Sequence, residues 1–215
     1  MPTSRKKTGL VAALIGGAST LASTGLIGAP IETPAWDLEA SHDGWEIRRY
    51  EPRLEARVTV TGDDFKEAVN RGFRVLAGFI FGENAGAESV EMTAPVSASR
   101  SAKIAMTAPV GASAETGGGW TVSFTMPSTF TASTLPRPTD PRIQIVEVPG
   151  GSWAVAPFRG RAVKRRQAVT ESLESALAER GLEAHGAPEI AQYNPPWIPG
   201  PMRRNEILIR LASLQ

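Results

Sequence analysis

Cysteine is absent from this chain of 215 residues. Its absence excludes disulfide bonds, thiol nucleophiles, thiolate metal sites and iron–sulfur clusters. Histidine is scarce as well: only His42 and His185 are present, and their separation does not fit a metal-ligand motif. The signatures of P-loop NTPases, dinucleotide-binding folds, α/β-hydrolases and zinc metalloproteases are missing too. We therefore expect a protein that is not an enzyme.

The chain also lacks a charge excess of either sign. It has 23 Lys plus Arg against 22 Asp plus Glu, for a net charge of +1. A near-neutral chain does not carry the basic footprint of a nucleic-acid-binding protein, so nucleic acid is not an expected partner. The hydrophobic fraction of 41% is typical of a globular protein. The length favours one folded domain with an appendage.

The N-terminal segment contains no acidic residue before Glu32. Three cations, Arg5, Lys6 and Lys7, precede an uncharged stretch, which is the order of a secretory signal or an N-terminal anchor. Glycine, serine and threonine within the stretch make it a poor spanning helix. We expect residues 1–31 to be a signal peptide or membrane anchor of an exported, periplasmic or membrane-attached protein. The alternative is a disordered tail on a cytoplasmic protein.

The remaining chain, residues 32–215, contains two similar halves. Residues 45–60 alternate between polar and apolar side chains, which predicts two strands joined by a turn, and an amphipathic helix over 64–80 follows. Residues 143–158 repeat the alternation, and a second helix is expected over 162–180. The repeat predicts one α+β domain with two pseudo-symmetric β-β-α-β units, in which both helices cover one antiparallel sheet.

Further strands are expected between and after these units. Two copies of the pentamer MTAPV predict a hairpin of residues 89–96 and 103–110, with Met92 and Met106 packed rather than bound to a ligand. Residues 120–126 predict another strand, and residues 205–211 a closing one.

Several short motifs are distinctive as a set. They are ETP at 32–34, YEP at 50–52, KIAMTAPV at 103–110, FTMP at 124–127, LPRP at 135–138, FRG at 158–160, YNPPW at 193–197 and RRNE at 203–206. In this order the chain resembles the SOUL haem-binding protein family. The resemblance implies a distorted antiparallel β-barrel with two helices, similar to the GyrI-like ligand-binding domains. It also implies non-covalent binding of haem or a related tetrapyrrole.

The resemblance assigns no iron ligand. A first-strand histidine that binds iron in part of the family falls in residues 47–50, where this chain has Arg49. The metal ligand is therefore unknown. Other members hold the macrocycle in an apolar groove along the first helix, and the candidate groove residues here are Phe73, Leu76, Ala77 and Ile80. Candidate partners for the propionates are Arg71, Arg74, Arg203 and Arg204.

The same apolar spacing is typical of a helix that faces a core, so a purely structural role for the groove residues stays open. The first interpretation is a non-enzymatic tetrapyrrole-binding protein that acts as carrier, buffer or sensor. The alternative keeps the fold but binds another small apolar ligand or a partner peptide. A third reading is an enzyme that uses Glu91 or Glu206 as a pocket carboxylate.

Overall fold

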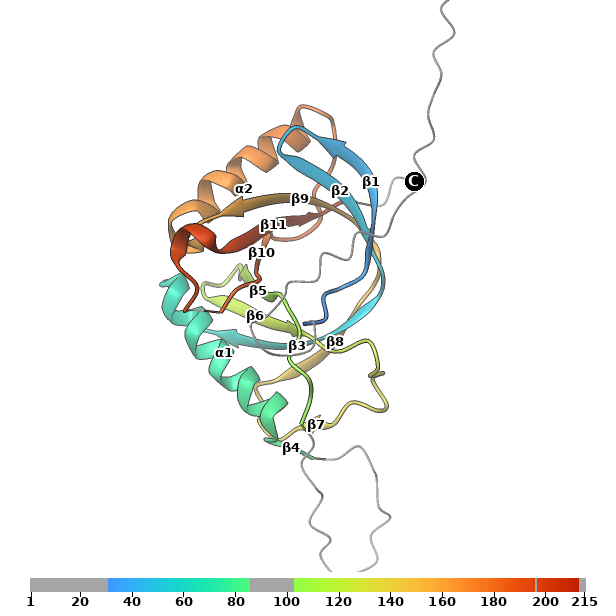
Figure 1. Cartoon of the computed structure of the whole chain (residues 1–215), viewed down its shortest axis with the longest axis vertical. Helices are drawn as coiled ribbons and strands as arrows, with labels where there is room; N and C mark the ends of the chain where they lie inside the picture. The colour runs from blue at the N-terminus through green and yellow to red at the C-terminus, as the bar shows by residue number, and fades with distance from the viewer. Residues whose placement is uncertain (1–30, 86–102, 196, 213–215) are drawn as a thin grey trace, which may run out of the picture.

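The computed structural model describes residues 31–85, 103–195 and 197–212, and is dominated by one curled antiparallel sheet (Figure 1). Nine strands follow the order β1-β2-β9-β11-β10-β5-β6-β3-β8. The strands are β1 (Trp36–His42), β2 (Trp45–Tyr50), β3 (Arg53–Val60), β5 (Val110–Ala114), β6 (Trp120–Thr125), β8 (Gln144–Val148), β9 (Gly151–Arg159), β10 (Glu189–Gln192) and β11 (Arg204–Arg210). Outside this sheet lie the short pair β4 (Asn84–Ala85) and β7 (Arg137–Pro138) and the 3-10 turn η1 (Gly200–Met202).

The sheet confirms the two-fold repeat. Apart from β1, each strand of the first half has a counterpart at the mirrored place in the order: β2 with β8, β3 with β9, β5 with β10 and β6 with β11. The two halves meet where β5 pairs with β10. Each unit is therefore β-β-α-β-β, one strand longer than predicted.

The predicted pairing within residues 45–60 is wrong. β2 pairs with β9, and β3 pairs with β6 and β8. Tyr50 lies opposite Gly151 and Arg53 opposite Val148, so the same antiparallel register continues across residues 51–52 and 149–150, where both strands are interrupted. We call this interruption the kink. Pro52 has no N–H to donate, which fits a position between two pairing segments. One long kinked ribbon thus joins the two halves, and the same correction applies to residues 143–158.

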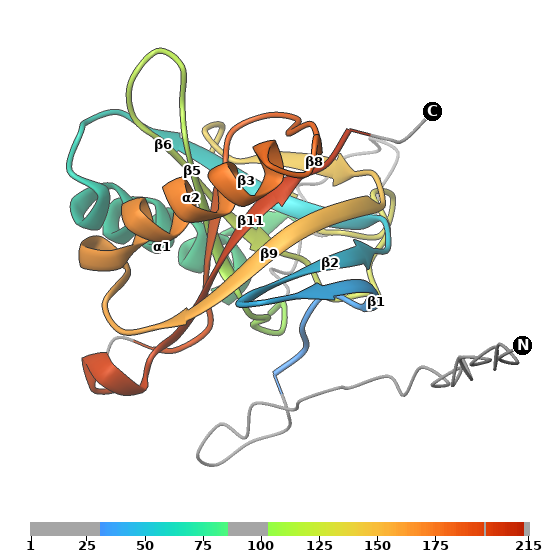
Figure 2. The same cartoon turned by 90° about the horizontal axis from the view of Figure 1, so that it is seen from above.

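The first helix, α1 (Phe65–Phe81), is capped at both ends. The Asp64 side chain accepts a hydrogen bond of 2.7 Å from the backbone N–H of Glu67, and Gly82 ends the helix at φ 127°. Its apolar stripe packs on β3 and β6. The second helix, α2 (Ala162–Ala178), packs on β9, β10 and β11. Both helices cover one face of the sheet, as predicted (Figure 2).

The predicted hairpin around the MTAPV pair is not seen as such. Residues 89–96, including Met92, lie outside the described residues. Residues 103–109 form no strand, the peptide before Pro109 is cis, and β5 begins only at Val110 and pairs with β6. The Met106 side chain is exposed rather than packed. None of the helices in the described part of the chain is long and apolar enough to cross a membrane.

Candidate functional site

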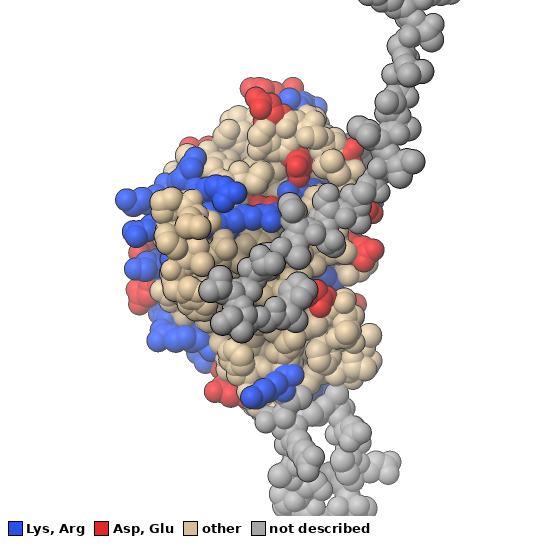
Figure 3. All heavy atoms as spheres, in the orientation of Figure 1, with Lys and Arg blue, Asp and Glu red and all other residues tan. Residues whose placement is uncertain are grey.

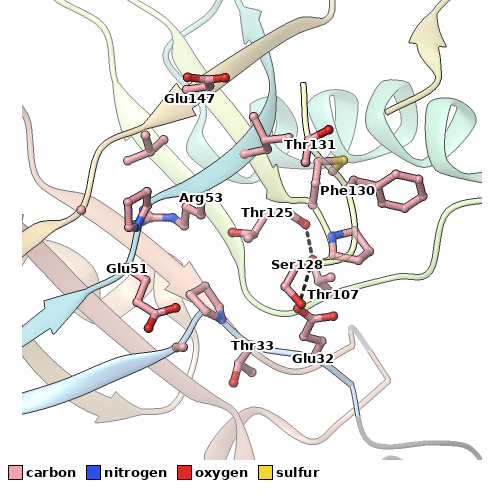
Figure 4. A pocket seen from close by; sticks show the side chains of 18 of the residues that line it. Glu32, Thr33, Glu51, Arg53, Thr107, Thr125, Ser128, Phe130, Thr131 and Glu147 are labelled. Atoms are coloured by element: carbon pink, nitrogen blue, oxygen red, sulfur yellow. Dashed lines mark hydrogen bonds between the residues drawn. The ribbon is translucent and has the colours of Figure 1, made fainter. Parts of the chain in front are cut away.

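The kink in the ribbon borders a pocket of about 920 Å³ (Figure 4). Its walls come from residues 32–35, 51–54, 125–128, 130–132 and 147–150, together with Thr107. Pockets for small molecules are typically about 300–1,000 Å³. The pocket is therefore large enough for a drug-sized or cofactor-sized ligand.

Apolar side chains supply much of the pocket wall. Leu54, Met126 and Val148 are buried, and Phe130 is half-buried beside them. Several prolines add rigid apolar surface, namely Pro34, Pro52, Pro127 and Pro149. Such a wall suits a flat apolar ligand, because it offers contact area without hydrogen-bonding groups that would need partners.

Arg53 is the only cation among the described residues that line the pocket. Its Nε donates to Glu55 at 2.8 Å, while its Nη1 is buried and finds no hydrogen-bond partner among the described residues. A buried donor without a partner costs about 1–3 kcal/mol. Because this nitrogen is closed to solvent, a ligand carboxylate in the pocket would form a charge-assisted bond with it only after the guanidinium had turned toward the pocket.

Carboxylates also line the pocket. Glu32 accepts a hydrogen bond of 2.8 Å from the backbone N–H of Ser128. Glu51 and Glu147 are exposed and have no resolved ion pair with Arg53. The lining therefore offers one cation and three anions.

Arg53 also lines a smaller cavity, together with one carboxylate from each half of the molecule. Glu55 on β3 is buried and is held by Arg53 and by Arg57, whose Nε lies 3.0 Å away. Glu55 and Glu189, which lies on β10, both line this cavity of about 30 Å³, which has room for about one water. Burial and the negative charge of Glu55 raise the pKa of Glu189 to about 7, against the opposing effect of nearby arginines.

The candidate enzyme carboxylate Glu206 is not accessible to a substrate. It is fully buried on the helix-free face and accepts hydrogen bonds from Arg48 at 3.1 Å, Arg204 at 2.7 Å and the Tyr193 hydroxyl at 2.5 Å. Burial, together with the Glu206 charge, raises the pKa of Tyr193 well above its ordinary value, so its hydroxyl stays protonated and donates. The other candidate, Glu91, lies outside the described residues.

The four apolar candidates on the first helix do not form one open wall. Leu76 and Ile80 are buried in the core against β3 and β6, which corrects the expectation that they line a groove. Phe73 and Ala77 are half-buried. None of the four lines the pocket at the kink. A ligand contact at Phe73 or Ala77 stays a prediction.

The four cationic candidates are not brought together either. Arg71 donates to the backbone oxygen of Thr61 at 2.5 Å, and Arg74 is exposed. Arg204 is directed by Glu206 onto the helix-free face, away from α1. The Arg203 Nε donates to the backbone oxygen of Ile198 at 2.8 Å. A joint role at one end of a ligand is therefore not supported by this arrangement.

The described residues that line the pocket include no histidine, cysteine or tyrosine, and Met126 supplies the one thioether. Arg49, at the position of the family's strand histidine, pairs with Glu39 at 2.5 Å. His42 is the last residue of β1 and stacks on Trp45 with ring centroids 4.1 Å apart. In residues 31–85, 103–195 and 197–212 no three His, Cys, Asp or Glu side chains gather as a metal site.

The pocket itself was missed from the sequence, although a signal for it was present. Three of the motifs that carry the family resemblance border it: ETP through residues 32–34, YEP through Glu51 and Pro52, and FTMP through residues 125–127. KIAMTAPV adds Thr107, which donates to the backbone oxygen of Thr125. Segments that are far apart in the sequence converge here because the kinked ribbon brings them together.

Comparisons with known structures show the same fold. The C-terminal domain of EcmrR superposes with a TM-score of 0.59 at 8% identity, over 79% of this chain and 98% of that one. A structure of EcmrR in complex with DNA gives 0.53 at 12% identity, over 79% and 57%. A hydrolase from Listeria innocua gives 0.51 at 12% identity, over 81% and 94%. At such identities the similarity concerns the fold alone.

No curated protein matches the sequence. A family model described as SOUL heme-binding protein matches residues 31–210, which is nearly all of the described chain. Both halves, the kinked ribbon and the pocket fall within the match. The chain belongs to the SOUL heme-binding protein family.

Proposed function

We propose that the protein is a non-enzymatic carrier, buffer or sensor of haem or a related tetrapyrrole, and that the ligand occupies the pocket at the kink. The observation that carries this proposal is the convergence of the ETP, YEP and FTMP motifs on one cavity. Family membership supports a tetrapyrrole as the ligand class.

Arg53 is the residue proposed to hold a propionate. It is the one cation among the described residues that line the pocket, and its Nη1 has no hydrogen-bond partner, so a turn of the guanidinium toward the pocket would give that donor a carboxylate to bind. Leu54, Met126 and Phe130 supply the apolar surface for the ring. Burial of apolar area at about 25 cal/mol per Å² supports micromolar affinity after the costs of association. Binding is therefore proposed to depend on contact area more than on an iron bond.

The test is a titration of the full chain with haemin, followed by Soret absorbance, and with metal-free protoporphyrin. The two ligands should bind within about tenfold of each other. Arg53→Gln should weaken both by about tenfold or more, which is the effect of one lost charge-assisted bond. Arg57→Gln is the matched control, because Arg57 binds the same Glu55 but does not line the pocket.

Equal affinities of the Arg53 and Arg57 variants would overturn the assignment to this pocket. If Arg74→Gln weakened binding instead, the ligand would lie along α1. Loss of binding in His42→Ala or His185→Ala alone would indicate an iron-ligated site.

A second candidate is an apolar ligand that carries a positive charge. The three carboxylates around the pocket, Glu32, Glu51 and Glu147, favour it. Protoporphyrin dimethyl ester and a tetracationic porphyrin distinguish the two. Tighter binding of the cationic porphyrin, unaffected by Arg53→Gln, would support this candidate.

A further inference from the structure

A basic surface lies where β9 leads into α2. Five of the eight residues from Arg159 to Arg166 are cations, and none is acidic. Arg159, Arg161, Lys164 and Arg165 are exposed. The fifth cation, Arg166, lies over the ring of Phe65 at 4.6 Å. Lys and Arg side chains gather on this side of the molecule (left in Figure 3), although the whole chain is nearly neutral.

Exposed apolar side chains lie beside these cations. Trp197 is 79% exposed, Met202 is 64% exposed, and Val163, in the first turn of α2, is 50% exposed. The loop of residues 197–203 rests on the start of α2: the backbone N–H of Gly160 donates to the oxygen of Arg203 at 3.0 Å. Gly200 is also so close to Arg161 that a Cβ there would lie 3.2 Å from its Cγ.

Arg165 donates to the backbone oxygen of Arg159 at 2.9 Å, but the cations do not cap the helix that carries them. A helix N-terminus favours negative charge, yet α2 has Arg161 as its N-cap without a side-chain hydrogen bond and has no acidic residue in its first turn. The equivalent position before α1 is Asp64, which caps that helix. A local rule broken without local compensation points to a function of the surface.

We infer that residues 159–165 and 197–202 form a surface that binds anionic lipid membranes. Each Lys or Arg near an anionic bilayer contributes to attraction, and tryptophan favours the membrane–water interface. Val163 and Met202 gain from burial among acyl chains but offer nothing to a phosphate or a base edge, which favours a lipid surface over nucleic acid. The inference is independent of the proposed pocket and of residues 1–30.

The first experiment is co-sedimentation of the full chain with vesicles of phosphatidylcholine, alone or mixed with phosphatidylglycerol. Any contribution of residues 1–30 is then shared by all variants. The triple variant R161Q/K164Q/R165Q should reduce partitioning onto the anionic vesicles by about a hundredfold. The control K103Q/R137Q/R142Q removes the same charge from exposed sites elsewhere and should change it by less than about threefold.

The second experiment places the surface in the bilayer. Brominated lipids should quench part of the tryptophan fluorescence, and Trp197→Phe should remove that part. The inference is overturned if the wild type ignores anionic vesicles, if both triple variants lose binding equally, or if Trp197→Phe leaves the quenched fraction unchanged. Tighter, charge-dependent binding to DNA than to vesicles would replace it with a nucleic-acid surface.

Discussion

The two helices occupy equivalent places in the two halves, but they are used differently. α1 buries six residues, among them Leu76, Phe79 and Ile80, whereas α2 buries only three. α1 begins at an acidic cap and α2 at an arginine. The two halves therefore share the arrangement of their backbones, but the side chains on the surfaces of their helices differ. The first helix serves the core, and the second leaves most of its surface available to a partner.

The helix-free face offers a second comparison, since each half holds one buried carboxylate between two arginines. Glu206 lies between Arg48, whose side chain is 5% exposed, and Arg204. Glu55 lies between Arg53 and Arg57, whose side chains are 12% and 30% exposed. The Arg204 side chain is 37% exposed. The Glu206 network therefore contains both the most enclosed of the four arginines, Arg48, and the most exposed one, Arg204.

Neutralising these carboxylates should give the largest effect on stability. Glu206→Gln should lower the free energy of unfolding by about 3–5 kcal/mol, because the buried Arg48 then keeps only the partly exposed Glu46 as a counter-charge. Glu55→Gln should cost less, about 1–3 kcal/mol, because neither Arg53 nor Arg57 is as enclosed as Arg48. Urea unfolding followed by circular dichroism measures both. Equal losses, or a larger loss for Glu55→Gln, would show that the two networks are equivalent after all.

The next largest effect on stability is expected from a substitution where α1 packs closely on the sheet. α1 approaches β6 so closely that a Cβ on Gly72 would lie 2.5 Å from Val122 Cγ2. Gly72→Ala should therefore cost about 1–3 kcal/mol through overpacking, although alanine is the better helix former. The corresponding residue of α2 is Val169, which is half-buried against the core, and Val169→Ala should lower the free energy of unfolding by about 1 kcal/mol through lost apolar burial. A stabilised Gly72→Ala variant would mean that the first helix can shift outward at little cost.

The sequence predicted both helices well because apolar spacing and capping are local signals. The helix expected over 64–80 is observed at Phe65–Phe81, and that expected over 162–180 at Ala162–Ala178. Strand partners were not predictable in the same way. Alternation in residues 45–60 identifies extended chain, but it does not say whether the chain turns back or continues through a kink.

The pocket escaped prediction for a related reason. Its walls come from segments that are far apart in the sequence and meet only in the folded chain. The groove expected along α1 rested on Leu76 and Ile80, and a four-residue spacing is the same for a core face as for a ligand face. The structure shows that Leu76 and Ile80 belong to a core face, because they pack against β3 and β6. The family resemblance supplied the ligand class, but it could not supply the geometry.

The smallest expected effect tests the helix caps directly, because Asp64 and Arg161 occupy the same position before α1 and α2. Asp64→Ala should lower the free energy of unfolding by about 1 kcal/mol, through loss of the bond to the Glu67 N–H. Arg161→Asp should raise it by a similar amount, because Arg161 already has the extended backbone of a cap, and a carboxylate there complements the helix dipole.

The same Arg161→Asp protein should bind anionic vesicles more weakly than wild type, so stability and membrane binding should change in opposite directions. Thermal or urea unfolding and vesicle sedimentation on one preparation give both values. If Arg161→Asp were instead destabilising, the arginine would contribute to the fold, and the contrast between the two helix starts would no longer indicate a surface kept for a partner. Gains in both stability and vesicle binding would contradict an electrostatic role for Arg161 at the membrane.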